Sequence, residues 1–232
     1  MYPNPQRNDA DIFFEGNASY KREVTPDAEP NLAYMITKRM MDFTFAMIGL
    51  IMLSPLFLII SILIKLEDPK GSVFFCQTRI GKGGKPFRMF KFRSMVSNAE
   101  EMLEGLLDLN EISGAMFKMK NDPRVTKIGK WIRKTSIDEL PQLWNVIRGD
   151  MSLVGPRPAL PREVELYSNY DRLRLRVSPG CTGLWQVSGR SNLSFNQMIE
   201  LDLKYIERRG LWLDLKLIFC TIKIMLFPNS AY

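Results

Sequence analysis

The sequence predicts a mostly helical α+β fold with a membrane-anchoring segment near its N-terminus, a small β-hairpin and amphipathic helices around a compact domain. Three observations support this prediction. Residues 43–64 form an apolar run without a charge. Residues 73–95 place two apolar runs around a glycine-rich turn, and apolar residues recur at helical spacing in several later segments. The 232 residues, 46% of them hydrophobic, suffice for one ordinary domain with an appendage.

Composition and charge exclude several kinds of chemistry. The net charge of +7 indicates an anionic partner, such as nucleic acid, a phosphorylated substrate or anionic lipid. The sequence contains no histidine, which excludes a Ser-His-Asp triad, a His-activated cysteine and a His-ligated zinc site. Its three cysteines are far apart and form no C-x-x-C motif, so reduced thiols in a cytoplasmic setting are expected. Any acid–base or nucleophilic catalysis must therefore use Asp, Glu, Lys, Tyr, Cys or Ser.

The N-terminal part of the chain divides into an extension and a membrane anchor. Residues 1–30 are rich in Pro, Asn, Asp and Glu, so we expect a mobile extension. Residues 31–66 are the predicted anchor, because the apolar run within them is long enough to span a bilayer. Length and hydropathy favour a simple transmembrane span. A re-entrant hairpin is the alternative, because Ser54-Pro55 predicts a kink and both flanks are basic.

Residues 67–232 are predicted to form the compact domain. The stretch VFFCQTRIGKGGKPFRMFKFRSM predicts a β-hairpin, with Phe87, Met89, Lys91 and Arg93 on one face of its second strand.

Apolar periodicity predicts the helices of this domain. We expect helices over residues 97–110, over a short basic segment through Trp131, over residues 140–149 and over residues 195–209. Gly149 is expected to end the third of these. The apolar C-terminal tail predicts a helix that lies either in the membrane interface or on the core.

The stretch RKTSIDELPQLWNV presents two adjacent carboxylates, Asp138 and Glu139, and two interpretations. Ser136 and Glu139 fit the S-x-x-E capping box of a helix start, which the local sequence alone favours. Alternatively, the carboxylates are held among cations, where Arg133 and Lys134 would lower their pKa and keep them ionised. Ionised carboxylates can bind Mg²⁺ or act as nucleophiles.

Several cations are candidate phosphate ligands. Arg157 stands between two prolines in GPRP, which restricts its backbone and suits a guanidinium fork that must meet a phosphate. Arg190 follows a glycine in a loop, and Lys91 and Arg93 share a strand face. Each of these cations could instead be an ordinary surface charge that faces solvent. Together with the acidic pair and the apolar segment, they indicate phosphate chemistry with Mg²⁺ at a membrane surface.

From about Lys38 to its C-terminus the sequence resembles the bacterial monotopic phosphoglycosyl transferases, the polyprenyl-phosphate sugar-1-phosphate transferases that initiate exopolysaccharide and glycoconjugate assembly. The motifs that carry the resemblance, in chain order, are KR-x-x-D, the Ser-Pro pair, GSVFF, KFRSM, NDPRVTKIGKWIRKTSIDELPQL, SLVGPRP and PGCTGLWQVSGR.

This resemblance implies a reaction and the residues that perform it. The family transfers a sugar phosphate from a UDP-sugar to undecaprenyl phosphate and releases UMP. Asp138 would be the nucleophile that forms a covalent phosphosugar intermediate, with Mg²⁺ near it, and Glu139 would position or deprotonate the lipid phosphate. The family's phosphate-binding cations match Lys91, Arg133, Arg157 and Arg190, and Arg93, which shares the strand face of Lys91, is a further candidate.

The resemblance also implies a location and partners. It implies that the anchor is a Ser-Pro-kinked re-entrant helix in the bacterial inner membrane, and that the catalytic domain lies on the cytoplasmic face. A hexose donor, galactose or glucose, is expected, and an N-acetylated or deoxy-amino sugar is the alternative. A non-enzymatic, membrane-anchored binding protein is the competing class. Nucleic-acid binding is not expected, and homo-oligomerisation is left open.

Overall fold

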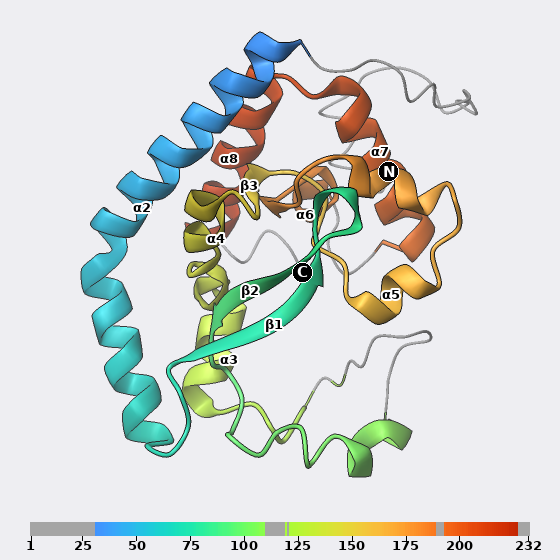
Figure 1. The fold of residues 1–232 in the computed structure, drawn as a ribbon. Helices are drawn as coiled ribbons and strands as arrows, with labels where there is room; N and C mark the ends of the chain where they lie inside the picture. Colours follow the sequence, from blue (N-terminus) through green and yellow to red (C-terminus); the bar gives the residue numbers. More distant parts are fainter. Residues whose placement is uncertain (1–30, 110–118, 120, 189–192, 227–232) are drawn as a thin grey trace, which may run out of the picture.

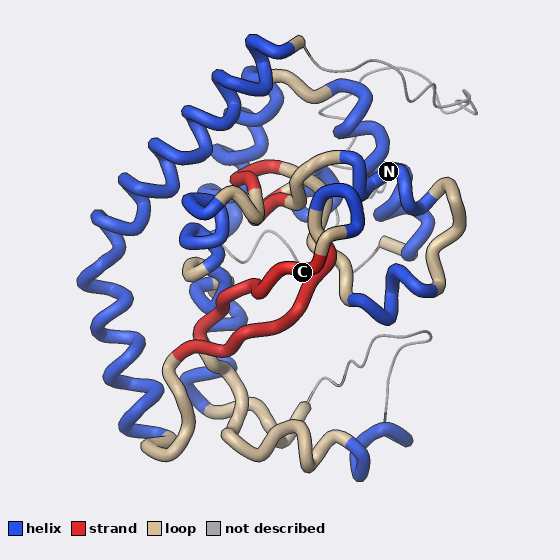
Figure 2. The backbone as a smooth tube through the Cα atoms, in the orientation of Figure 1, coloured by secondary structure: helices blue, strands red, loops and turns tan. Residues whose placement is uncertain are grey.

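The computed structural model describes residues 31–109, 119, 121–188 and 193–226, which form a mostly helical chain with two short pairs of strands near its centre (Figures 1 and 2). The predictions for residues 1–30 and for Arg190 lie outside the described residues.

Helix α2 (Leu32–Glu67) is the longest element and contains the predicted anchor. It begins after Asn31, whose side chain accepts the Ala33 N–H at 2.9 Å and so caps the first turn. It is long and apolar enough to cross a membrane. Pro55 lies inside one continuous helix, and a kink at the Ser-Pro pair stays a prediction.

One side of α2 packs along the domain, as Figure 1 shows. Ala46 in its first half and Ile60 in its second half are completely buried. The helix also carries large apolar side chains that are exposed, among them Met40, Ile51, Met52, Leu58, Ile59 and Ile62. An apolar exposed side opposite a packed side is the pattern of a helix with lipid on one flank and protein on the other.

The predicted β-hairpin is confirmed. Strands β1 (Phe74–Ile80) and β2 (Pro86–Phe92) pair antiparallel, joined by the short 3-10 turn η1 (Lys82–Gly84). Gly83 has a φ of 68°, which explains the glycine-rich turn. Of the residues expected on one face of β2, Met89 is buried in the main core.

The main core and a smaller cluster hold the helices and strands together. The main core contains Ala46 of α2 together with Val146, Val154, Leu184 and Leu217. In the smaller cluster, α2 packs on β2 and on helix α3 (Lys127–Lys134) through Ile60, Ile64, Phe92 and Ile132.

The helices that follow the hairpin agree with the predicted pattern, with one correction. Helices α3 (Lys127–Lys134), α4 (Gln142–Arg148), α7 (Phe195–Arg208) and α8 (Leu211–Leu226) occupy the predicted segments. The α-helix expected over residues 97–110 is wrong: the described part forms turns and the 3-10 helix η2 (Glu104–Leu109), with hydrogen bonds mostly between residues three apart. Gly105 and the clustered acidic residues there favour an α-helix poorly.

Gly149 ends α4 with a φ of 87°, as predicted.

A carboxylate at the end of α2 caps the N-terminus of α3. The Glu67 carboxylate accepts the N–H groups of Lys127 and Ile128 at 2.7 and 3.0 Å. It therefore satisfies donors that the first turn of α3 leaves free, and it links the anchor to the helix that leads to the acidic pair.

A second, parallel strand pair was not predicted. β3 (Ser152–Val154) lies beside β4 (Gly180–Thr182), with Ser152 opposite Gly180. Three-residue strands in glycine-rich sequence have too little periodicity to be recognised. Short elements complete the described chain: α5 (Pro161–Glu165), η4 (Asp171–Arg176) and α6 (Leu184–Ser188).

Replacing Gly180 with Ala is expected to destabilise the fold. A Cβ atom there would lie 2.1 Å from the Gly155 backbone nitrogen and 2.4 Å from the Thr182 carbonyl oxygen. Overpacking of this kind costs about 1–3 kcal/mol. We expect a lower midpoint of thermal unfolding in detergent for Gly180→Ala. Gly210→Ala is the matched control, because nothing lies within 4 Å of a Cβ there; equal midpoints for the two variants would contradict the packing.

Candidate active site

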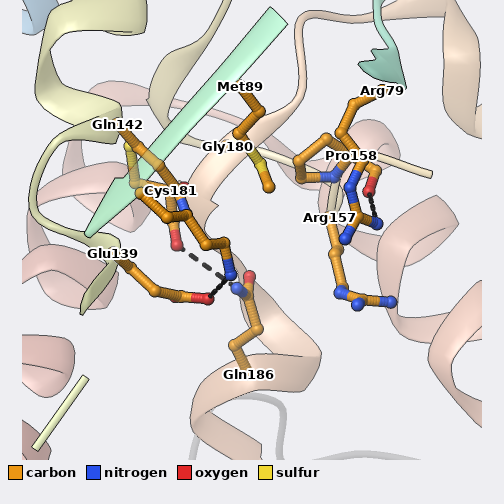
Figure 3. Close-up of a pocket in the computed structure, with 10 residues that line it drawn as sticks. Arg79, Met89, Glu139, Gln142, Arg157, Pro158, Gly180, Cys181 and Gln186 are labelled. Atoms are coloured by element: carbon orange, nitrogen blue, oxygen red, sulfur yellow. Dashed lines mark hydrogen bonds and ion pairs between the residues drawn. The ribbon is translucent and has the colours of Figure 1, made fainter. Parts of the chain in front are cut away.

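A small polar pocket brings together side chains from the hairpin, the acidic turn and the proline-rich loop (Figure 3). The acidic turn is the 3-10 helix η3 (Ile137–Glu139), which precedes α4. The charged residues that line the pocket are Arg79, Lys91, Glu139 and Arg157. Gln142 and Gln186 add amide groups. Three cations around one carboxylate make this pocket suited to an anion.

Lys91 and Glu139 form the ion pair at the centre of the pocket. The Lys91 Nζ lies 2.6 Å from the Glu139 Oε1. Burial acts to raise the pKa of Glu139, but the charges of Lys91, Arg157 and Arg79 outweigh it and hold that pKa below its ordinary value. The Glu139 side chain stays 41% exposed, so its carboxylate is ionised and open to a ligand.

The pKa of Asp138 shifts in the opposite direction to that of Glu139. It is 8% exposed, and burial raises its pKa to about 6, with the nearby Glu139 charge acting in the same direction. Lys91 and Arg133 lower the pKa of Asp138, but burial outweighs them. The predicted net lowering of the pKa by Arg133 and Lys134 is therefore wrong for Asp138, and the pKa of Glu139 is lowered by Lys91, Arg157 and Arg79 instead. Asp138 is not among the described residues that line the pocket.

The capping-box interpretation of Ser136 and Glu139 is wrong. Ser136 makes no side-chain cap hydrogen bond, and the Glu139 carboxylate reaches Lys91 instead. Ser136 has a φ of 57°, in the left-handed region that non-glycine residues seldom occupy. Such a conformation costs about 1–3 kcal/mol and is concentrated at functional sites. Here it turns the chain so that Glu139 points at the hairpin rather than along its own helix.

The loop that carries Arg157 is held on both sides. Arg79 is buried and donates to the Pro158 carbonyl at 3.0 Å (Figure 3). Arg174 donates to the Arg157 carbonyl at 3.3 Å, and its guanidinium also pairs with the buried Asp202. Two buried arginines thus fix the backbone of Arg157, whose own side chain is 35% exposed. A preorganised cation of this kind is what anion binding at a reaction centre requires.

Two of the predicted phosphate-binding cations, Arg93 and Arg133, lie outside the polar pocket. Arg93 is buried at the end of α2, where it donates to the Asp68 carbonyl at 2.8 Å and lies 3.4 Å from the Asp68 carboxylate. Arg133 is exposed in the last turn of α3, near enough to Asp138 to lower its pKa. The structure therefore brings Lys91, Glu139 and Arg157 together, and it does not bring Arg93 into the pocket.

Sequence reasoning missed Arg79, Gln142 and Gln186. Arg79 resembles any strand cation in the sequence, and the contact that matters, with Pro158, joins residues 79 positions apart. Gln186 lies in the short helix α6, where its Nε2 donates to the Cys181 carbonyl at 3.2 Å. The sequence did offer one signal of a contact between α4 and the hairpin: Asn145, a polar residue among the apolar positions of α4. It is completely buried and hydrogen-bonds Phe90 and Arg88 of β2.

The carboxylates of this region match the ligand preference of Mg²⁺. Among the residues that the structure describes, no group of three or more acidic or cysteine side chains could hold a metal alone. Mg²⁺ typically uses one or two carboxylates together with waters and substrate phosphates. Asp138 and Glu139 therefore fit a Mg²⁺ ion that arrives with a phosphorylated substrate, and they do not fit a resident metal cage.

Comparison with known proteins identifies the family. A family model described as bacterial sugar transferase matches residues 33–228. The chain belongs to this family. The match covers α2 from its second residue, the hairpin, the acidic turn and each helix that the structure describes after them.

Individual bacterial sugar transferases support the same assignment. The galactosyl transferase CpsE of Streptococcus agalactiae is 46% identical over 86% of this chain and 44% of its own length. The exopolysaccharide production protein ExoY of Rhizobium meliloti is 43% identical over 85% of this chain and 88% of its own. The UDP-N-acetylgalactosamine-undecaprenyl-phosphate N-acetylgalactosaminephosphotransferase of Aeromonas hydrophila is 42% identical over 87% of this chain and 46% of its own. The chain thus spans less than half of the first and third relatives and most of the second.

Proposed function

We propose that this bacterial sugar transferase moves a sugar-1-phosphate from a UDP-sugar to undecaprenyl phosphate and so initiates the synthesis of an exopolysaccharide or glycoconjugate. The observation that carries the proposal is the pocket in which Arg79, Lys91 and Arg157 surround the Glu139 carboxylate. Three cations gathered in this way suit the diphosphate of a nucleotide sugar. Support also comes from the Aeromonas relative, whose name includes both undecaprenyl phosphate and a UDP-sugar.

The reaction proceeds in two displacements at one phosphorus atom. An oxygen of the Asp138 carboxylate attacks the β-phosphorus of the UDP-sugar, the bond to the bridging oxygen breaks, and UMP leaves with that oxygen. A phosphate oxygen of the lipid then attacks the aspartyl phosphosugar, and the Asp138 carboxylate is regenerated. Splitting the transfer allows a soluble donor and a membrane-bound acceptor to react in turn.

Asp138 is the proposed nucleophile because Lys91 pairs with Glu139 and leaves Asp138 the less neutralised of the two carboxylates. The ionised form attacks, and the pKa of about 6 leaves most of the Asp138 population ionised at neutral pH. Glu139 is then placed to position the lipid phosphate or to accept its proton. Lys91 and Arg157 neutralise the transferring phosphoryl group, and we propose the same role for Arg133 and Arg190.

We expect donor-dependent UMP release to require Mg²⁺. When bound, Mg²⁺ neutralises charge on the donor diphosphate, and Asp138 is the side chain proposed to hold it. Excess EDTA should suppress UMP release, and Mg²⁺ added beyond the chelator should restore it. Full activity in EDTA, from protein first dialysed against chelator, would show that UMP release does not require Mg²⁺.

We propose a monotopic arrangement in the bacterial inner membrane, with the domain on the cytoplasmic face. Contacts at both ends of α2 support the monotopic path. Near its start, Lys38 lies 3.0 Å from Asp214 and Asp42 accepts the Leu153 N–H at 3.1 Å. At its end, Glu67 caps α3. A helix that crossed the membrane could not bind one domain with both of its ends. We therefore propose the re-entrant path, with a bend at the Ser-Pro pair.

The proposed donor is a UDP-hexose, galactose or glucose. CpsE is named a galactosyl transferase, which supports galactose. The alternative, an N-acetylated sugar, is favoured by the name of the Aeromonas relative.

Incubating purified protein in nanodiscs with Mg²⁺, undecaprenyl phosphate and one UDP-sugar at a time tests both the reaction and the donor. We expect UMP and a diphosphate-linked lipid sugar with one preferred donor. Folded protein that releases no UMP with any donor of a broad panel would contradict the proposed function.

A further inference from the structure

A large apolar groove adjoins the polar pocket. Its volume of about 1060 Å³ is at the upper end of small-ligand sites, which measure roughly 300–1,000 Å³. Its walls come from α2, α4, α6, α7 and α8, represented by Phe45, Leu143, Trp185, Met198 and Ile222. Helix α2 is distant in sequence from the other four helices, so the anchor completes the groove by packing on the domain.

The groove and the polar pocket meet at four residues that line both: Glu139, Arg157, Cys181 and Gln186. The charged residues of the groove are therefore at the end that it shares with the reaction centre. Elsewhere three of its polar side chains are engaged within the protein. Thr182 and Thr221 hydrogen-bond each other at 2.6 Å, and Ser194 accepts the Gln197 N–H at the start of α7.

The groove also reaches the apolar surface. Phe45 of α2 and Phe219 of α8 line it and are 42% and 68% exposed. The site therefore has a charged end beside the reaction centre, an apolar body and a mouth between apolar helices. This distribution matches a molecule with an anionic head and a long apolar tail.

Given the proposed function, we propose that this groove binds the isoprenoid chain of the polyprenyl phosphate acceptor, with the lipid phosphate at the end lined by Glu139 and Arg157. The first isoprene units then lie inside the protein, between α2 and α8, and the rest of the chain continues into the membrane. The chain leaves lipid that is as apolar as the groove, so van der Waals packing inside the groove supplies the binding energy, while Arg157 and Glu139 place the phosphate where the second displacement occurs.

The test compares the two half-reactions in variants that fill the groove. Ile222→Trp narrows it from α8, and Met198→Trp narrows it from α7. Ile62→Trp is the matched control, because Ile62 is 50% exposed against 47% for Ile222 and does not line the groove. Both groove variants should keep acceptor-independent UMP release within about twofold of wild type. Their KM for undecaprenyl phosphate should rise at least about tenfold, the size expected for steric changes in an apolar site.

An unchanged acceptor KM in both groove variants would overturn the proposal and would mean that bulk lipid, or a second copy of the chain, covers the groove. Equal loss of both half-reactions in a variant with the wild-type unfolding midpoint would also overturn it, because the groove would then serve the donor. Failure of the proposed function itself is distinguishable, since wild-type protein would then release no UMP with or without acceptor.

Discussion

Replacing Asp138 with Asn is expected to abolish transfer. The amide keeps the size of the side chain but cannot form the aspartyl phosphosugar intermediate, so the turnover number should fall by at least about 10⁴-fold. UMP release without acceptor should be lost to the same extent, because the first displacement itself is prevented. Both rates are measured on protein in nanodiscs with the preferred donor.

Two variants control this result. Glu207→Gln makes the same carboxylate-to-amide change at an exposed position of α7 and should leave the rates unchanged. Glu139→Gln should slow transfer to the lipid more than acceptor-independent UMP release, because Glu139 is proposed to act on the acceptor. Turnover by Asp138→Asn at a rate near that of wild type would end the assignment of Asp138 as nucleophile.

The second large effect is expected at Arg157. Its guanidinium lines both the polar pocket and the apolar groove, and its backbone is held by Arg79 and Arg174. Removal of the charge in Arg157→Gln should lower kcat/KM for the donor by about 10²–10³-fold. Arg157→Lys should recover only part of this loss, since an ammonium group cannot make the paired hydrogen bonds of a guanidinium.

Arg162 provides the matched control for Arg157. It is exposed in α5, close enough to Arg79 to affect its pKa, and it does not line the pocket. Arg162→Gln removes the same charge from the same neighbourhood and should change kcat/KM little. If both variants lost activity equally, the effect would be one of general charge rather than of the position of Arg157.

Patterns that are local in sequence were predicted well. The apolar run, the hairpin turn and the end of α4 at Gly149 follow from hydropathy, glycine content and backbone conformation at single positions. The same reasoning failed over the described part of residues 97–110. No residue from 97 to 106 is buried, so this amphipathic segment has little of the tertiary packing that stabilises most helices.

The site was predicted less completely because it is assembled from distant residues. Lys91 and Glu139 are 48 positions apart, and Arg79 and Pro158 are 79 apart. The pKa of Asp138 was predicted in the wrong direction, since the sequence shows neighbouring charges but not burial. The capping-box interpretation failed for a similar reason: the left-handed conformation of Ser136 depends on tertiary structure.

The covalent intermediate is the central claim, and the intact mass of the protein tests it most directly. Wild-type protein in nanodiscs without polyprenyl phosphate is incubated with the preferred UDP-sugar and Mg²⁺, quenched and analysed by mass spectrometry, with peptide mapping of any adduct. The account predicts a gain of one sugar phosphate, located on Asp138 and lost when undecaprenyl phosphate is added. Unmodified protein under conditions that support transfer, or an adduct on Glu139, would contradict it.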